Sequence, residues 1–261
     1  MGERNSRVSV IIPYSPEHTP AEMLEEAKMS ANMQSIETEI IVVEDTEQRG
    51  PAWARNRGMD KADSRYVAFL DADDIWKENK LTRQLSKMER TGAGICVEGL
   101  ERSKDQFILD VFLEKTISVT SSILIDTEKV DFSFNEDLYR REDHLFLIQA
   151  AERAGVCLCP DLIIVRKQDS GLSATSSPAK EVTAREEFAK LCFEQIEWLS
   201  GYKEDYYTLH YYRSGRRWHL FGNYECAVSF FVKSLQTGFC WKTFPALVLS
   251  LILMAWNKII K

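Results

Sequence analysis

Three aspartates within four positions are the residues of this chain best suited to chemistry. Asp71, Asp73 and Asp74 directly follow the apolar run at residues 66–70, which is typical of a buried parallel strand. Carboxylates are depleted in strands, so Asp71 is expected to mark the strand's end. Ligands bind at this carboxyl edge in open α/β sheets. Hard oxygen donors clustered there favour Mg²⁺ or Mn²⁺ holding a phosphate-bearing substrate.

A structural role for part of this cluster is the alternative. Asp74 is suited to capping a helix that begins near Trp76. A purely structural role for all three carboxylates is less favourable, because their like charges repel. A bound cation would relieve that repulsion, so the sequence favours a metal site, with the role of Asp74 open between the site and a helix cap.

The elements that position these acids follow the order strand, helix, strand, helix, strand. Apolar strands are expected at residues 8–13, 39–43 and 66–70, and helices at about 21–31, 52–62 and 81–88, the last closed by Gly92. Thr19 to Glu22 matches a capping box with proline at the first helical position. This alternation is typical of a doubly wound α/β sheet.

The pattern changes after residue 92. Short strands are expected at residues 94–100, 106–112 and 118–125, then a helix at 143–153 and a strand at 156–166. Residues 168–178 are polar and rich in Ser, Gly and Thr, as in a loop. The remainder is expected to be mostly helical, with one apolar face formed by Tyr224, Val228, Phe231 and Leu235.

Bulk properties place the chain among soluble globular proteins. Its 261 residues allow one large domain or two small ones. Residues 1–13 do not match a signal peptide, because the apolar stretch is too short. Six cysteines lack metal-ligand spacing, and Cys157 and Cys159 would share one face of a strand. Reduced thiols in the cytosol are the simplest interpretation.

The C-terminal tail, residues 239–261, is apolar and basic. Residues 244–256 are nearly all apolar but shorter than the roughly 20 residues of a spanning helix. Trp241, Lys242, Trp256, Lys258 and Lys261 resemble interfacial anchors. From His210 onward the net charge is +6, against −13 before it. We expect the tail to lie on an anionic membrane surface; packing on the preceding domain and spanning are the alternatives.

Charged residues converge on the carboxyl edge of the expected sheet. Glu44 and Asp45 end the second strand, Asp71 to Asp74 end the third, and Arg55 and Asn56 lie on the helix between them. Arginine pairs with phosphate, and an acid can contact a base or ribose. Neither GxGxxG nor GxxxxGK[ST] occurs, so dinucleotide-dependent redox chemistry and P-loop chemistry are not supported.

Five motifs in order resemble the family 2 inverting glycosyltransferases of GT-A fold. They are Val8-Ser-Val-Ile-Ile-Pro13-Tyr14, Glu39-Ile-Ile-Val-Val-Glu44-Asp45, Ala54-Arg55-Asn56-Arg57-Gly58, Phe69-Leu70-Asp71-Ala72-Asp73-Asp74 and Asn135-Glu-Asp-Leu-Tyr-Arg-Arg-Glu142-Asp143. The resemblance covers roughly residues 7–170 and implies a Rossmann-like mixed sheet flanked by helices. Its catalytic domain would span residues 1–175, with a nucleotide-binding half (7–92) and an acceptor half (93–175). A helical C-terminal region would follow at 176–261.

The resemblance implies roles for eight residues of the site. Pro13, Tyr14 and Asp45 would line the nucleotide, with Asp45 at the base, and Arg55 would lie beside the nucleotide or its phosphates. Asp71 would contact the ribose and the metal shell, and Asp73 would bind Mg²⁺ or Mn²⁺ directly. Asp143 would be the general base, with Glu142 as the alternative base or as a neighbour that tunes its pKa. Helix capping is the structural alternative for Glu142 and Asp143.

Some segments depart from the family's pattern. Thr46-Glu47-Gln48 follows the second-strand acids, which leaves the choice of nucleotide open. Arg166-Lys167-Gln168 lacks the histidine that many members place after the last strand, so water and diphosphate would complete the metal shell. His144, next to the expected base, is interpreted as incidental.

These observations predict a metal-dependent glycosyltransferase of the hexosyltransferase type. The donor would be a UDP- or GDP-type nucleotide-diphospho-sugar, and the acceptor a glycan or polyprenyl-linked precursor of a surface glycan. Nucleic acid is not expected as a partner. The protein would be cytoplasmic, peripheral on the cytoplasmic face of the cell membrane. The alternatives are a noncatalytic sugar-nucleotide-binding or assembly protein on the same fold and, ranked lower, a sugar-phosphate nucleotidyltransferase.

Overall fold

The chain forms two compact units in a computed structural model that describes residues 7–116, 120–164 and 177–260. The first unit comprises Met1–Asp137 and Glu142–Ser170, and the second comprises Leu138–Arg141 and Gly171–Lys261. Arg166-Lys167-Gln168, most of the loop predicted at 168–178 and the Lys261 anchor lie outside the described residues, as do residues 118 and 119 and the side chain of Lys258.

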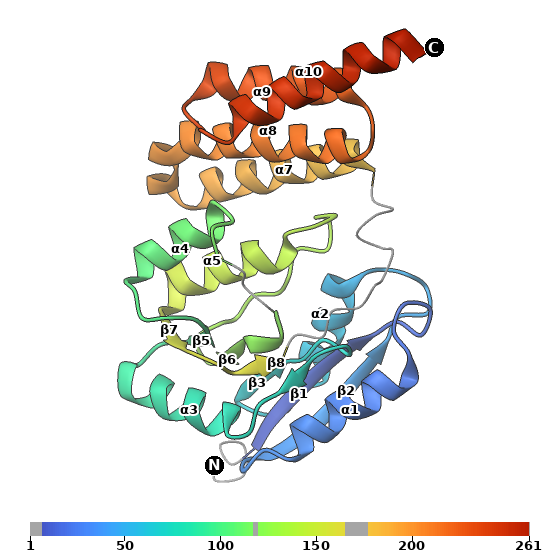
Figure 1. The fold of residues 1–261 in the computed structure, drawn as a ribbon. Coiled ribbons are helices and arrows are strands. Elements are labelled where there is room, and N and C mark those ends of the chain that lie inside the picture. Colours follow the sequence, from blue (N-terminus) through green and yellow to red (C-terminus); the bar gives the residue numbers. More distant parts are fainter. Residues whose placement is uncertain (1–6, 117–119, 165–176, 261) are drawn as a thin grey trace. The chain divides into compact units, whose positions relative to one another are not determined.

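The first unit is a six-stranded mixed sheet with helices on both faces (Figure 1). The strand order is β2-β1-β3-β6-β5-β7, and β4 and β8 form a separate pair. In chain order its elements are β1 (Arg7–Tyr14), α1 (Ala21–Asn32), β2 (Glu37–Glu44), α2 (Pro51–Lys61), β3 (Tyr66–Phe69), β4 (Ile75–Trp76), α3 (Lys80–Thr91), β5 (Ile95–Glu98), α4 (Lys104–Phe112), a 3₁₀ turn (Thr120–Ser122), β6 (Leu124–Asp126), α5 (Glu142–Ala154), β7 (Val156–Cys159) and β8 (Ile163–Ile164).

The strand register brings the expected site to one edge of the sheet. β1 is parallel to both β2 and β3, so Tyr14 pairs with Glu44 and Ile11 pairs with Phe69. The carboxyl ends of these three strands therefore lie together. β6 runs antiparallel to β3 and to β5, which makes the sheet mixed and confirms the expected fold class.

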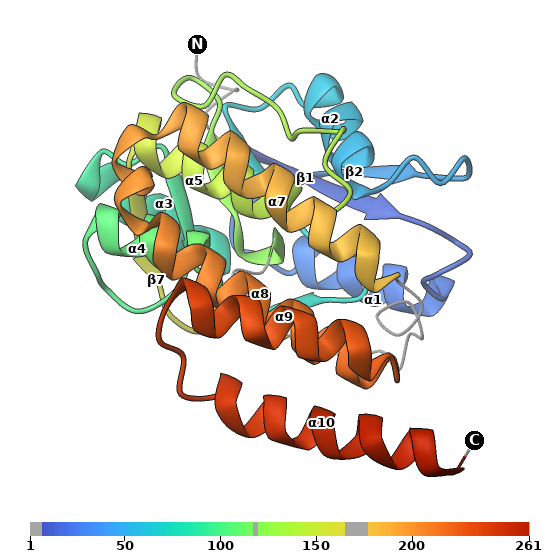
Figure 2. The same ribbon diagram turned by 90° about the horizontal axis from the view of Figure 1, so that it is seen from above.

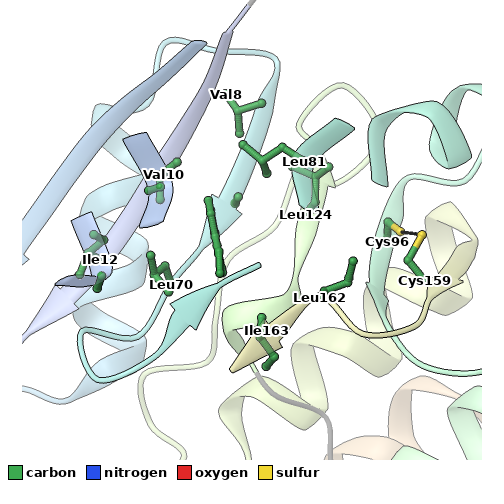
Figure 3. Close-up of a cluster of buried hydrophobic side chains, with 14 of the residues drawn as sticks. Val8, Val10, Ile12, Leu70, Leu81, Cys96, Leu124, Cys159, Leu162 and Ile163 are labelled. Atoms are coloured by element: carbon green, nitrogen blue, oxygen red, sulfur yellow. Dashed lines mark hydrogen bonds between the residues drawn. The ribbon is translucent and has the colours of Figure 1, made fainter. Parts of the chain in front are cut away.

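Alternating side chains of each strand form two cores. Val8, Val10 and Ile12 point to the face covered by α1 and α3, where they join Leu70, Leu81 and Leu124 (Figure 3). Ile11 and Phe69 are fully buried on the opposite face, which α2, α4 and α5 cover (Figure 1). Both faces are buried, which is why β1 and β3 read as continuous apolar runs.

Three local expectations are wrong. Residues 106–112 lie in helix α4 and not in a strand: Ser103 Oγ caps the helix by accepting from Gln106 N, and the apolar side chains recur at helical spacing and are buried. Thr19 makes no cap, because Pro20 is the N-cap of α1 and no side chain bonds there. Asp74 does not cap a helix, because β4 follows it.

The second unit is helical. It contains α7 (Pro178–Gln195), a 3₁₀ turn (Glu197–Tyr202), α8 (Lys203–Leu220), α9 (Tyr224–Thr237) and α10 (Thr243–Ile260). Gly215 lets α8 approach α9 closely, because a Cβ there would lie 2.6 Å from the ring of Phe231. α10 packs along α9 (Figure 2). Among the described residues, no helix is long and apolar enough to span a membrane.

Candidate active site

Asp71 stands at the end of β3 with its carboxylate partly open to solvent. Its backbone N–H donates to Ser121 Oγ at 3.0 Å, which fixes the chain where it leaves the sheet. The side chain is 29% exposed, and only Oδ1 is bonded, to Arg55. Oδ2 has no donor among the described residues. Asp71 is thus held firmly and keeps one oxygen available to a ligand.

Asp74 is buried and serves the fold. Ser121 Oγ donates to its carboxylate at 2.5 Å, and Asp74 N donates to the carbonyl oxygen of Asp71 at 3.0 Å. The same serine accepts the indole N–H of Trp76 on its carbonyl oxygen at 2.7 Å. Ser121 therefore fixes the conformation of the turn that contains Asp71 and Asp74. Sequence reasoning missed Ser121, because no motif marks a serine in a turn 50 residues from Asp71.

Arg55 links the acids that follow β3 to those that begin α5. Its guanidinium, 4% exposed, donates to Asp71 Oδ1 at 3.0 Å and to Glu142 Oε1 at 3.1 Å. It also lies 5.5 Å from the centre of the Phe134 ring. Burial opposes the charged form, but the carboxylates of Asp71 and Glu142 outweigh it and raise the pKa of Arg55 above its ordinary value. The arginine is therefore a permanent buried cation.

Helix α2 presents Arg55 because it packs closely on β1. A Cβ on Gly58 would lie 2.3 Å from Ile11 Cγ2, so only glycine fits at this contact. Two residues before this glycine, Asn56 exchanges two hydrogen bonds of 2.9 Å with the backbone of Phe134 and donates to Glu136 at 2.7 Å. The Arg-Asn pair of the third motif thus holds the segment that leads towards α5.

Glu142 and Asp143 form the first turn of α5, and their environments differ. Burial and the charge of Asp143 raise the pKa of Glu142, although Arg55 opposes this. Burial would also raise the pKa of Asp143, but hydrogen bonds from His144 and the charge of Arg55 outweigh it and lower that pKa to about 2. Both carboxylates therefore lie in the same electrostatic network as Arg55.

The two carboxylate oxygens of Asp143 differ in how they are bonded. Its Oδ1 accepts from the backbone N–H of His144 at 2.8 Å and contacts the His144 ring Nδ1 at 2.9 Å. Within the described part of the chain, its Oδ2 receives a single long contact of 3.4 Å, from Thr120 Oγ1. The interpretation of His144 as incidental is wrong, since its ring orients the carboxylate. Sequence reasoning gave no signal for Thr120.

The residues predicted to line the nucleotide lie at the ends of β1 and β2. Pro13 and Tyr14 are half-buried, and the Tyr14 carbonyl oxygen accepts from Asp45 N at 2.8 Å. The Asp45 carboxylate is buried and accepts the backbone N–H groups of Arg49 at 2.9 Å and Gly50 at 2.7 Å. Asp45 thus shapes the turn that precedes α2, and each oxygen retains acceptor capacity.

The donor set suits a magnesium-type ion bound mainly through its substrate. Asp71 and Asp73 are partly exposed, whereas Asp74 is buried against Ser121. Within the described residues, no cluster of three or more His, Cys, Asp or Glu side chains is arranged to hold a metal. Mg²⁺ and similar hard cations are usually bound by one or two carboxylates together with water and substrate phosphates. Asp71 and Asp73 fit that pattern.

Comparisons of the sequence identify related proteins. The family model described as "Glycosyl transferase family 2" matches residues 7–147. A putative teichuronic acid biosynthesis glycosyltransferase, TuaG of Bacillus subtilis, is 39% identical over 88 residues, which are 33% of this chain and 35% of that protein. The UDP-Glc:alpha-D-GlcNAc-diphosphoundecaprenol beta-1,3-glucosyltransferase WfgD of Escherichia coli is 37% identical over 65 residues, 25% of this chain and 26% of WfgD. The matches thus span about a third and a quarter of these relatives.

A solved structure shares the fold over nearly the whole chain. The mannosyltransferase PcManGT from Pyrobaculum calidifontis, in complex with GDP-Man and Mn²⁺, aligns with a TM-score of 0.57 at 16% identity and covers 97% of this chain and 81% of that chain. At this identity the similarity shows the fold alone.

Proposed function

The chain belongs to glycosyl transferase family 2, and from that premise we propose that it transfers a sugar from a nucleotide-diphospho-sugar to an acceptor hydroxyl with inversion. The observation that carries the proposal is the buried Arg55, which joins Asp71 at the end of β3 to Glu142 at the start of α5. One cation thereby fixes the acids expected on the donor side relative to those expected on the acceptor side. Such positioning is the main requirement of a single displacement between two substrates.

The donor half is built from the ends of β1, β2 and β3. Pro13 and Tyr14 would line the nucleotide, and Asp45 would contact the base with the acceptor capacity that its turn leaves free. Asp71 and Asp73 would hold Mg²⁺ or Mn²⁺, which neutralises charge on the departing nucleoside diphosphate when bound. Arg55 would act as a positioning residue, because both of its terminal nitrogens are occupied by carboxylates.

The acceptor half centres on Asp143. Its open Oδ2 would take the proton of the acceptor hydroxyl while the hydroxyl oxygen bonds to the anomeric carbon and the bond from that carbon to the diphosphate breaks. A pKa of about 2 makes Asp143 a weak base on its own. The negative charge of a bound diphosphate would raise it towards the working range. Glu142 is the alternative base, and its Oε1 is already held by Arg55.

A lipid-linked acceptor is proposed from two observations. The relative WfgD is named for an acceptor that is a sugar linked to diphosphoundecaprenol. In this chain, α10 exposes large apolar side chains, including Phe244 at 64%, Ile252 at 59% and Trp256 at 60%. We place the C-terminal tail against the cytoplasmic face of the cell membrane, where such an acceptor would be available.

The experiment is a panel of UDP- and GDP-sugars with Mn²⁺ or Mg²⁺, followed for transfer to a polyprenyl-diphosphate sugar and for slow hydrolysis. We expect one donor to be consumed only when the cation is present. Binding of a donor without turnover on any acceptor or on water would favour a noncatalytic sugar-nucleotide-binding protein. Failure of every donor to bind would refute the enzyme proposal.

A further inference from the structure

The helical unit contains a pocket that the proposed reaction does not use. It has a volume of about 550 Å³ and lies between α8 and the start of α10. Its lining includes three basic and three apolar side chains: Arg216, His219, Lys242, Leu220, Trp241 and Leu249. No acidic residue lines it. All of these residues belong to the second unit, so the pocket is complete within that unit.

The two permanent cations of the pocket have no ionic partner. Arg216 and Lys242 are exposed, and neither forms an ion pair with a carboxylate of the described residues. The neighbouring Arg217, by contrast, lies 3.3 Å from Glu181. From His210 to the end of the chain Glu225 is the single acid in the sequence. The pocket is therefore complementary to an anion.

His219 fixes the two walls of the pocket. Its Nδ1 lies 2.8 Å from Ser250 Oγ, and that hydroxyl donates its own hydrogen to the carbonyl oxygen of Ala246 at 2.9 Å. The proton of the first bond must therefore come from His219, which joins α8 to α10. Ser250 is fully buried, so water does not compete for this contact. This bond ties α8, which carries Arg216, to α10, which Lys242 directly precedes.

The mouth of the pocket is apolar. Leu220 is 71% exposed, Trp241 is 68% exposed and Leu249 is 49% exposed. Phe239, just before α10, is 91% exposed. Large apolar side chains around a cationic pocket match an amphiphile better than a soluble anion, because the acyl region of a lipid can cover them while its phosphate reaches the cations. Figure 2 shows α10 running beside α9, which leaves its other side uncovered within this unit.

We propose that the pocket formed by Arg216, Lys242 and the apolar rim of α10 binds the phosphate of an anionic phospholipid. The helical unit would thereby select anionic membranes and not merely apolar surfaces. The inference rests on the proposed membrane contact of the tail, to which it adds a defined headgroup site. It does not depend on the identity of the sugar donor.

The test is flotation of the full chain with vesicles of phosphatidylcholine alone and of phosphatidylcholine mixed with phosphatidylglycerol. The variant R216Q/K242Q removes both cations. The matched control K190Q/K203Q removes two exposed lysines of the same unit, on α7 and α8, away from the pocket. Each cation near an anionic surface contributes roughly fivefold in binding, so R216Q/K242Q is expected to bind the mixed vesicles about 25-fold more weakly. The control is expected to bind them like the wild type.

Three results would overturn the inference in distinguishable ways. Equal loss in R216Q/K242Q and K190Q/K203Q would mean that general charge acts and not the pocket. Equal binding of the wild type to both vesicles would leave the membrane contact standing without headgroup selection, and displacement by inorganic phosphate at constant ionic strength would then assign the pocket to a soluble anion. Absence of wild-type binding to either vesicle would refute the membrane contact itself. Circular dichroism of each variant establishes that it is folded.

Discussion

Asp71 and Glu142 accept hydrogen bonds from the two terminal nitrogens of one guanidinium, that of Arg55, at 3.0 Å and 3.1 Å. The first carboxylate ends β3 and the second begins α5, so segments far apart in the chain share a single buried cation. Truncating one partner of such a network leaves the others charged and unpaired in a poorly hydrated site. Replacing any one of Arg55, Asp71 and Glu142 should therefore disturb the positions of the other two.

Replacing Arg55 should damage stability and turnover. Arg55→Met leaves two carboxylates without their cation and should lower the free energy of unfolding by about 3–5 kcal/mol. Arg55→Lys keeps the positive charge, but its ammonium lacks the two fixed terminal nitrogens that bond Asp71 and Glu142. The resulting misplacement of these acids should reduce the rate of sugar transfer about 100-fold. Thermal melting and donor turnover measure the two effects. Arg57→Met is the control, because Arg57 is exposed on the same helix; equal effects of Arg55→Met and Arg57→Met would contradict the coupling.

Removing the base should separate binding from turnover. Asp143→Asn keeps the shape of the side chain but cannot accept the acceptor's proton, so turnover should fall about 100- to 10,000-fold while donor affinity is unchanged. Glu142→Gln retains an acceptor oxygen for Arg55 and should lose less. Calorimetric donor binding and single-turnover rates provide the comparison. A larger loss in Glu142→Gln than in Asp143→Asn would exchange the roles of the two acids.

The acid limb of the pH–rate profile should depend on His144. Its hydrogen bond to Asp143 lowers the pKa of that carboxyl, so removing the ring leaves a carboxylate that holds its proton to higher pH. His144→Ala should therefore move the fall of kcat/KM at low pH upward. His18→Ala, at an exposed site outside the network, should leave the profile as in the wild type. An unchanged acid limb in His144→Ala would show that Asp143 does not titrate in the reaction.

Lys80 should make the first unit less stable at neutral pH than at alkaline pH. The side chain is fully buried; its ammonium donates to Gln84 Oε1 at 2.7 Å and lies 4.1 Å from the centre of the Trp76 ring. Burial lowers the pKa of Lys80 from 10.5 to about 7. Between these two pH values Lys80 is protonated in the unfolded chain but neutral in the folded one. The free energy of unfolding therefore rises with pH across this interval, and the gain is lost as the pH falls back towards 7.

Lys80→Met removes this dependence. Hydrogen exchange of β5 amides, followed from pH 7 to pH 10 and corrected for intrinsic exchange rates, should show protection rising with pH in the wild type relative to the variant. Parallel curves for the two proteins would mean that Lys80 keeps an ordinary pKa in the folded state.

Much of the sheet was predictable because its strands are buried on both faces. Residues 8–13 and 66–70 are largely apolar runs, and the acids that follow residue 70 mark the carboxyl edge. A strand was wrongly predicted at residues 106–112 because their apolar side chains are also typical of buried strands. Phe107, Ile108, Val111 and Phe112 instead form the buried face of a helix that Ser103 caps. Composition alone does not separate the two periods in so short a run.

The site was predictable where one motif supplies one residue, and not where a contact joins distant segments. Local patterns placed Asp71 and Asp73 after a buried strand and Asp143 at the start of a helix, where the structure has them; their roles stay predictions. The bond from Arg55 to Glu142 crosses 87 positions, and Ser121 reaches Asp74 across 47. His144 bonds its direct neighbour, a contact that side-chain geometry at a helix start permits but that helical spacing does not predict. Such contacts depend on packing, which a single sequence does not display.

The central claim is that Asp73 helps to hold a cation-bound donor while Asp74 serves the fold. Calorimetric titration of the donor in Mn²⁺, compared with the same titration in a chelator, tests it most directly with wild type, Asp73→Asn and Asp74→Asn. Asp74→Asn retains an acceptor for Ser121 and should bind the donor in Mn²⁺ like the wild type. Asp73→Asn should lose the Mn²⁺-dependent part of the affinity, while circular dichroism establishes that the variant is folded. Equal Mn²⁺-dependent binding in Asp73→Asn and wild type, or a loss confined to Asp74→Asn, would contradict the account.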